Sequence, residues 1–235
     1  MKLSDKQEDI IGRWISSVET GTPEGDYGCV TVLSDNPKGQ PQITYGFHQT
    51  TESGGNLKSL IKNYLSREDA DISDLSRSRL IEFSKAPMYS MVGNVQLKSV
   101  LERSGNDPVM QDVQNEFFLE HYMAPARSWA EKNGFTLPLS MLVIYDSFVQ
   151  SGGIPSWIRK RFRAVPPAKG GDEKEWIAQY INARHQWLKY WGDGKSGKSM
   201  AIRASRYRTD AMGIEIARGN WDLSKPDIVV NGIKI

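Results

Sequence analysis

Asp146 and Arg184 each lie on the apolar face of a predicted helix. In the segment "PLSMLVIYDSFVQSGG", Asp146 shares its face with Leu139, Leu142 and Val149. In "EKEWIAQYINARHQWLKYW", Arg184 lies at helical spacing with an apolar stripe; that stripe consists of Ile177, Tyr180, Ile181 and Trp187. Burying either charge without a partner would cost several kcal/mol. We therefore expect the two helices to pack together and these residues to form an ion pair.

A further cation is available from the last predicted helix. Its segment "IRASRYR" supplies Arg203, Arg206 and Arg208. An arginine suits a buried network because its planar guanidinium can pair bidentately and does not deprotonate. Such a network could simply fix the register of the helices, or it could extend to a catalytic acid.

Glu19 and Asp35 are the candidate catalytic acids. A glycosidase needs two carboxylates in different protonation states, on opposite sides of a cleft. Glu19 ends an apolar helix and enters a Gly-rich loop, whereas Asp35 lies in the turn of the following hairpin. The chain has 28 acidic residues, and acids are common at helix ends and in turns. Spacing alone therefore leaves a structural and a catalytic interpretation open.

The composition limits the other classes of function. The chain has 235 residues, is 39% hydrophobic and carries a net charge of +2, which is too mild for a nucleic-acid binder. Its most basic stretch, 158–163, is interpreted as a solvated surface or as a contact for an anionic polymer.

Cys29 is the single cysteine, so no intrachain disulfide can form. It lies in a β-branched run typical of a buried strand, and only three histidines accompany it, His48, His121 and His185. We expect no metal site and no cofactor.

No segment has the character of a membrane span or of an apolar signal region. We expect no membrane insertion. We expect an extracellular or cell-wall-acting protein, either released by lysis, injected, or present as a mature fragment.

The elements that must position these residues are mostly helices. Ser4 and Gln7 form a capping-box pattern for a first helix that ends near Glu19. Residues 29–47 have the pattern of a hairpin, and the Asn231–Gly232 pair predicts a second, small hairpin near the end of the chain. The other predicted helices cover 56–65, 74–87, 107–134 (with a kink or break at Pro125), 138–153, 173–191 (capped by Asp172) and 199–219. The fold class is mainly α with a small β-hairpin.

Several blocks resemble glycoside hydrolase family 46, the chitosanases. These blocks are "WISSVETGT", the hairpin ending in "TYGF", "IYDSFVQSG", "PAKGGDEKEWIAQYINAR", "SRYRTD" and "GNWDL". They occur in the family's order and span nearly the whole chain. The resemblance implies a two-lobed, lysozyme-like chitosanase fold with a cleft between the lobes. It also implies a single glycoside hydrolase domain over residues 1–235.

The resemblance also implies roles for individual residues. Glu19 matches the general acid and Asp35 the general base. A hydroxyl that positions the attacking water falls on Thr44, with Gln42 as an alternative on the same strand face. The supporting charge network falls on Asp146, Arg184 and Arg206.

The implied mechanism is a single displacement with inversion, in an endo-acting enzyme that cleaves β-1,4 linkages of an amino-sugar polymer. Glu19 protonates the glycosidic oxygen, and Asp35 activates a water on the other face of the sugar. This requires roughly 6.5–9.5 Å between the two carboxyls. A lone guanidinium beside Glu19 would favour its ionised form and make it a poor acid, whereas one shared with Asp146 would orient it at a smaller cost. We expect a monomer whose partner is a polysaccharide.

The chain departs from the family pattern at positions that contact substrate. The family's amino-sugar-binding Asp falls near Gly55 or Asn56, with Glu52 close but shifted, and a frequent His falls near Ser151. A polycationic substrate should meet carboxylates rather than the basic segment 158–163. Both chitosan and peptidoglycan therefore stay open as substrates. The alternative function is a catalytically inactive carbohydrate-binding or phage/effector structural protein on the same fold. A plain helical interaction protein would leave the two buried charges unexplained.

Overall fold

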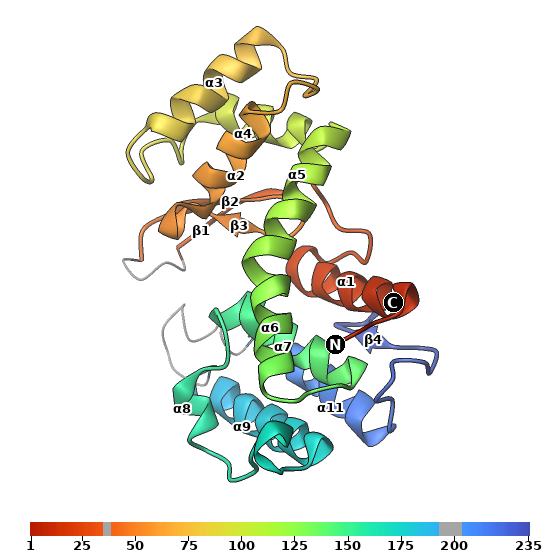
Figure 1. Ribbon diagram of the computed structural model, residues 1–235. Helices are drawn as coiled ribbons and strands as arrows, with labels where there is room; N and C mark the ends of the chain where they lie inside the picture. The colour runs from red at the N-terminus through yellow and green to blue at the C-terminus, as the bar shows by residue number, and fades with distance from the viewer. Residues whose placement is uncertain (35–38, 193–203) are drawn as a thin grey trace. The chain divides into compact units, whose positions relative to one another are not determined.

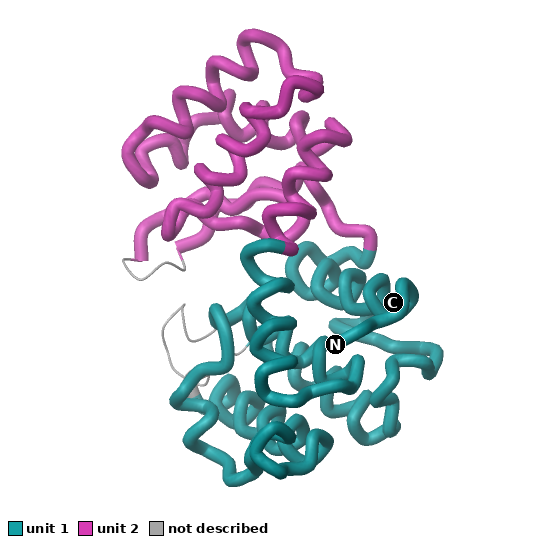
Figure 2. The backbone as a smooth tube through the Cα atoms, in the orientation of Figure 1, with its two compact units in different colours: residues 1–23, 120–235 teal, residues 24–119 magenta. Residues whose placement is uncertain are grey.

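The computed structural model describes residues 1–34, 39–192 and 204–235, and it is mostly helical (Figure 1). The chain divides into two compact units (Figure 2). Unit 1 comprises residues 1–23 and 120–235, and unit 2 comprises residues 24–119. The predicted class, mainly α with a small β-hairpin, is confirmed.

Unit 2 contains a three-stranded antiparallel sheet and four helices. The strands are β1 (Val30–Leu33), β2 (Gln42–Tyr45) and β3 (Thr50–Thr51), in the order β1-β2-β3. The helices are α2 (Asn56–Leu65), preceded by the short 3-10 turn η1 (Ser53–Gly55), then α3 (Asp74–Lys85), α4 (Val95–Ser104) and α5 (Pro108–Phe118). The predicted hairpin is present. The sequence analysis missed strand β3 and helix α4, although Asn94 caps α4 by accepting a hydrogen bond from the N–H of Leu97 at 2.9 Å.

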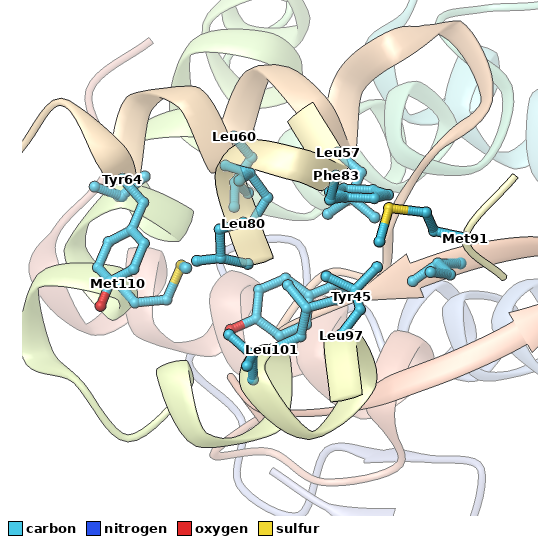
Figure 3. Packing of buried hydrophobic residues seen from close by; sticks show 14 of the residues in the cluster. Tyr45, Leu57, Leu60, Tyr64, Leu80, Phe83, Met91, Leu97, Leu101 and Met110 are labelled. Atoms are coloured by element: carbon cyan, nitrogen blue, oxygen red, sulfur yellow. The ribbon is translucent and has the colours of Figure 1, made fainter. Parts of the chain in front are cut away.

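The two faces of this sheet have different characters. Ile43 and Tyr45 point into the core of unit 2, where they pack with residues of α2, α3, α4 and α5 (Figure 3). Because side chains alternate along a strand, Thr44 points to the other face. There it lies opposite Thr31 of β1 and Thr51 of β3. The sheet therefore presents a row of threonines on the side away from the apolar core.

Unit 1 is built around the buried helix α7 (Pro138–Ser151). Every residue of α7 from Leu139 to Ser147 is buried, and α7 packs against three other helices of the unit; these are α1 (Asp5–Thr20), α6 (Ala124–Lys132) and α9 (Glu173–Gly192). Helix α11 (Tyr207–Ala217) packs on α9 and on a hairpin of β4 (Val229–Val230) and β5 (Ile233–Lys234). The shorter segments α8 (Ser156–Arg159) and η3 (Pro167–Lys169) lie between α7 and α9 in the chain.

Local sequence signals account for most of these boundaries. The capping box at Ser4 is present, and the N–H of Glu175 donates to the Asp172 carboxylate at 2.7 Å. The long helix predicted over 107–134 is divided, as expected. A π-helical turn, η2 (Leu119–Met123), separates α5 from α6, and Pro125 lies in the first turn of α6. Proline has no N–H to donate and its ring crowds the preceding turn, which explains the interruption.

Two other features concern membrane insertion and the reactivity of the single cysteine. Among the described helices, none is both long and apolar enough to cross a membrane. Cys29 precedes β1 and is half-buried rather than buried within the strand, which corrects the prediction. Burial and the nearby Asp26 raise the pKa of its thiol, so the unreactive protonated form is favoured.

Candidate active site

The predicted ion pair between Asp146 and Arg184 is present in unit 1. Arg184 Nη2 donates to Asp146 Oδ2 at 2.6 Å, and the two side chains are 0% (Asp146) and 1% (Arg184) exposed. The same nitrogen also hydrogen-bonds to Gln150 Oε1, one turn further along α7. The charge on the apolar face of α9 is therefore neutralised by the charge on the apolar face of α7.

Arg208 joins this pair to Glu19. Its Nη1 donates to Asp146 Oδ1 at 3.0 Å, and its Nη2 donates to Glu19 Oε1. The Arg208 side chain is 7% exposed, whereas that of Glu19 is 16% exposed. The structure thus contains a continuous charge chain from Arg184 through Asp146 and Arg208 to Glu19, and only the last member reaches the surface.

The second arginine of the network is Arg208, and the prediction of Arg206 is wrong. Arg206 is the N-cap residue of α11 and is only half-buried. Arg208 lies within the helix, on the buried face that also carries Ala211, Met212 and Glu215. Helical spacing along "RTDAMGIE" would have selected Arg208, since positions 208, 211, 212 and 215 share one face. The error came from following the resemblance, whose block "SRYRTD" contains both arginines.

Two residues of α11, Tyr207 and Arg208, fix the end of α1. Tyr207 donates its hydroxyl hydrogen to the carbonyl oxygen of Val18 at 2.8 Å, and Arg208 Nη2 approaches the same oxygen at 3.4 Å. Gly21 then takes a left-handed conformation with φ of 80°, which ends the helix directly after the catalytic candidate. Sequence reasoning missed Tyr207 because its role depends on α11 docking beside α1.

The electrostatics favour a permanently charged Arg208. Burial works against the cation, but the carboxylates of Glu19 and Asp146 outweigh it and raise the pKa of Arg208 above its ordinary value. Tyr145 of α7 is buried, and this burial together with the charge of Glu19 raises the pKa of its hydroxyl. Both groups therefore keep their protons over the working range of a protein.

The predicted water-positioning residue, Thr44, has a different environment. Thr44 is 1% exposed. Its hydroxyl hydrogen-bonds to Thr31 Oγ1 and to Gln49 Oε1, the latter at 2.7 Å. The alternative, Gln42, is 2% exposed and accepts the N–H of Ser53 at 2.8 Å. Both side chains are thus hydrogen-bonded within unit 2, and the contact of Thr44 with the attacking water stays a prediction.

The remaining predicted positions belong to unit 2. Asp35, the predicted general base, lies outside the described residues, in the chain segment between β1 and β2. Glu52 is 1% exposed, and its Oε1 accepts the N–H of Tyr89 at 2.7 Å. Asn56 begins α2. In the described part of the chain, no group of three or more His, Cys, Asp or Glu side chains could hold a metal ion.

Comparisons with known proteins agree with this geometry. Residues 13–226 match the model of glycosyl hydrolase family 46. A chitosanase of that family from Gynuella sunshinyii, in complex with chitotetraose, has a TM-score of 0.80 and 26% identity, covering 99% of this chain and 100% of that one. Native chitosanase from Bacillus subtilis MY002 has a TM-score of 0.78 and 22% identity, with both chains fully covered.

A mutant of that Bacillus chitosanase complexed with 6 GlcN has a TM-score of 0.75 and 21% identity, covering 98% of this chain and 97% of that one. Among curated proteins, none matches the chain significantly. The family match covers most of the chain, and the fold is shared along its whole length. The chain therefore belongs to glycosyl hydrolase family 46 and is a glycosidase.

Proposed function

We propose that the protein is an endo-acting, inverting hydrolase that cleaves the β-1,4 linkages of chitosan. The observation that carries the proposal is the contact of Arg208 with both Glu19 and the buried Asp146. A structural salt bridge would need only two partners. This chain of charges ends instead at a carboxylate that reaches the surface.

Glu19 is the proposed general acid. Arg208 holds Oε1, and no described residue donates a hydrogen bond to the other carboxyl oxygen. That oxygen can carry the proton and deliver it to the glycosidic oxygen as the bond breaks. Asp146 compensates part of the charge of Arg208, and the guanidinium holds Glu19 in a fixed orientation.

Asp35 is the proposed general base. In an inverting reaction it takes a proton from the water that attacks the anomeric carbon from the opposite face. Thr44 is the proposed residue that orients this water, and its buried hydroxyl is held in place by its bond to Gln49. No cofactor is required by this chemistry.

The fold also supports chitosan as the substrate. The solved relatives are chitosanases, and those complexed with chitotetraose and with 6 GlcN match this chain over nearly its full length. Because the fold is shared from end to end, the simplest substrate is the one those relatives take.

Peptidoglycan, which shares the β-1,4 amino-sugar backbone, is the second candidate. The basic segment 147–171 contains no acidic residue. It favours peptidoglycan because such a segment suits an anionic polymer better than a polycation.

The test is release of reducing sugar from chitosan by the wild-type protein and by Glu19→Gln and Asp35→Asn. We expect each variant to lose at least about 100-fold in kcat, since each removes one half of the acid–base pair. Proton NMR of the first products should show the α-anomer. Turbidity loss of purified peptidoglycan is measured in parallel. A folded wild-type protein that acts on neither polymer would disprove the hydrolase, and an initial β-anomer would disprove inversion.

A further inference from the structure

Two tryptophans form an exposed aromatic pair on unit 1. Trp157 lies on the short helix α8 and is 52% exposed. Its ring centroid lies 6.2 Å from that of Trp187 on α9, with the ring planes inclined by 47°. Helices α8 and α9 pack against each other (Figure 1), which holds the pair in place. A half-exposed tryptophan contributes little to a core, so its position needs another explanation.

Trp187 does not belong to the buried stripe to which the sequence pattern assigned it. The buried side of α9 carries Ile181, Arg184 and Leu188, which are 5%, 1% and 2% exposed. Trp187 is only half-buried and lies at the edge of that face, one helical turn beyond Arg184. One member of the aromatic pair, Trp187, is therefore on the same helix as Arg184 and one turn from it.

Two exposed cations directly follow α8 in the chain. Lys160 and Arg161 follow Trp157 by three and four residues, and both are exposed. The N–H of Arg161 donates to the Ile158 carbonyl at 2.9 Å, so the chain makes one further turn past the end of α8 and keeps both cations next to that helix. Arg159 is used differently, since its guanidinium donates to the carbonyl oxygens of the following loop at 3.0 and 2.8 Å.

The chain on either side of these cations is poor in carboxylates. Residues 147–171 contain no Asp or Glu, and their basic residues are Arg159, Lys160, Arg161, Arg163 and Lys169. Along α9, the acids Glu173 and Glu175 occupy the first turn. Trp187 is twelve residues beyond Glu175, which corresponds to about 18 Å along the helix. The segments that carry the tryptophan pair are therefore basic as well as aromatic.

We propose that Trp157, Trp187, Lys160 and Arg161 form an accessory binding surface for an anionic amino-sugar polymer, namely peptidoglycan. An exposed indole face can pack against the apolar face of a sugar ring, with the ring hydroxyls still in water. The two cations would pair with the carboxylates of the polymer. This surface goes beyond the proposed hydrolysis, because it needs neither Glu19 nor Asp35.

Charge complementarity selects this occupant over others. Chitosan carries ammonium groups, which Lys160 and Arg161 would repel. Neutral chitin could stack on Trp157 but would gain nothing from the cations. A single-stranded nucleic acid could use both features. The position of the surface, one turn from Arg184 in a glycosidase, favours a glycan, and a nucleic acid is therefore treated as an outcome of the test.

The test measures binding by co-sedimentation in the Glu19→Gln background, so that the polymer is not degraded. The probes are peptidoglycan sacculi freed of teichoic acid, chitin and chitosan, with a single-stranded DNA oligonucleotide measured by fluorescence anisotropy. We expect sacculi to bind most tightly. Trp157→Ala and the double variant Lys160→Glu/Arg161→Glu should each weaken that binding about tenfold. The double variant should also show a weaker dependence on salt.

The matched controls are Trp157→Phe, which keeps an aromatic ring, and Lys62→Glu/Lys132→Glu, which makes the same charge change at exposed positions elsewhere. Both should bind sacculi within about twofold of the parent. The surface is disproved if the double variant at 160 and 161 binds sacculi normally, if chitin binds as tightly as sacculi, or if DNA binds more tightly than sacculi. Chitosan hydrolysis is measured separately with Glu19 intact, so a failure of the proposed function is distinguishable from a failure of this surface.

Discussion

Arg208 is the residue on which the candidate site of unit 1 depends most directly. It is the member of the network that contacts both carboxylates, and it does so through different nitrogens. The two nitrogens of a planar guanidinium are held in a fixed geometry. The bond of Nη1 to Asp146 therefore also fixes where Nη2 lies, and with it the position of the Glu19 carboxylate. A lysine could neutralise one carboxylate but could not hold two in register.

Replacing Arg208 with lysine should therefore separate charge from geometry. We expect Arg208→Lys to keep the net charge but to lose at least about tenfold in kcat, because one of its two carboxylate contacts is lost. Arg206→Lys is the matched control, and it should retain its activity within about twofold, since Arg206 occupies the N-cap position of α11 without a side-chain capping hydrogen bond. Steady-state kinetics on chitosan decide the matter. Equal losses in both variants would contradict the assignment of Arg208.

Arg184 and Asp35 should differ in how their loss affects the protein. Arg184→Ala removes one partner of a fully buried ion pair, and we expect it to lower the free energy of unfolding by about 3 kcal/mol, or roughly 6–12 °C in Tm. Activity should fall with it. Asp35→Asn should reduce activity with little change in Tm, since its proposed role is chemical.

The control for stability is Lys189→Ala, which removes an exposed cation from the same helix. Its Tm should change by less than about 2 °C. Differential scanning calorimetry provides the comparison. An unchanged Tm for Arg184→Ala would mean that the buried pair contributes nothing to stability.

At the scale of elements, the start of α9 is tied to the start of α7. The Glu173 carboxylate accepts hydrogen bonds from the N–H of Thr136 at 2.9 Å and from the N–H of Leu137 at 2.8 Å. It also accepts the hydroxyl of Thr136 at 2.9 Å. These contacts join the two helices that carry Arg184 and Asp146. The alignment of α9 with α7, and so of Arg184 with Asp146, thus depends also on the contacts of Glu173.

Loss of this attachment should weaken both helices. We expect Glu173→Ala to lower the free energy of unfolding by about 2 kcal/mol, because two backbone N–H groups and a hydroxyl lose a charged acceptor. Glu175→Ala is the matched change two residues later, where the carboxylate accepts only from Gln179 among the described residues. It should cost less than about 1 kcal/mol. Urea unfolding of both variants would show the difference, and equal midpoints would refute it.

At the scale of the whole molecule, one half-buried histidine should make stability depend on pH. His48 lies in unit 2 between the rings of Phe47 and Phe118, and burial lowers its pKa well below the ordinary value. In the unfolded chain its pKa is about 6.5. Between these two values the unfolded chain binds a proton that the folded protein excludes. The free energy of unfolding therefore loses nothing to His48 above about pH 6.5, and it decreases as the pH is lowered below that value.

His48→Phe should remove this part of the pH dependence. We expect the free energy of unfolding of the wild-type protein to fall by about 1.4 kcal/mol more than that of the variant between pH 7.5 and pH 5.5. Urea denaturation at the two pH values measures it, and comparing differences cancels the contribution of the surface carboxylates. Parallel curves for the two proteins would show that His48 is protonated in the folded state.

The sequence by itself determined the class of the fold, most of the helices and the pairing of Asp146 with Arg184. Helix periodicity, capping residues and Pro125 act over a few neighbouring residues, so they can be recognised locally. The ion pair could be predicted because a buried charge requires a partner, and few cations were available on apolar faces. Strand β3 was missed because it is only two residues long. Helix α4 does carry local signals, namely the Asn94 cap and the stripe of Leu97, Val100 and Leu101, so it could have been predicted.

Helical spacing is enough to place Arg208 on the buried face of α11, but only the tertiary structure decided that this face meets Glu19, and where Thr44 and Trp187 point. Arg206 and Arg208 are two residues apart, and their directions differ because α11 begins at Tyr207 and docks with one particular face against α1 and α7. Thr44 lies in a strand whose neighbours use its hydroxyl, and Trp187 lies at the edge of α9 where α8 packs. Each outcome depends on contacts between segments far apart in the chain, and residue types and spacing do not encode those contacts locally.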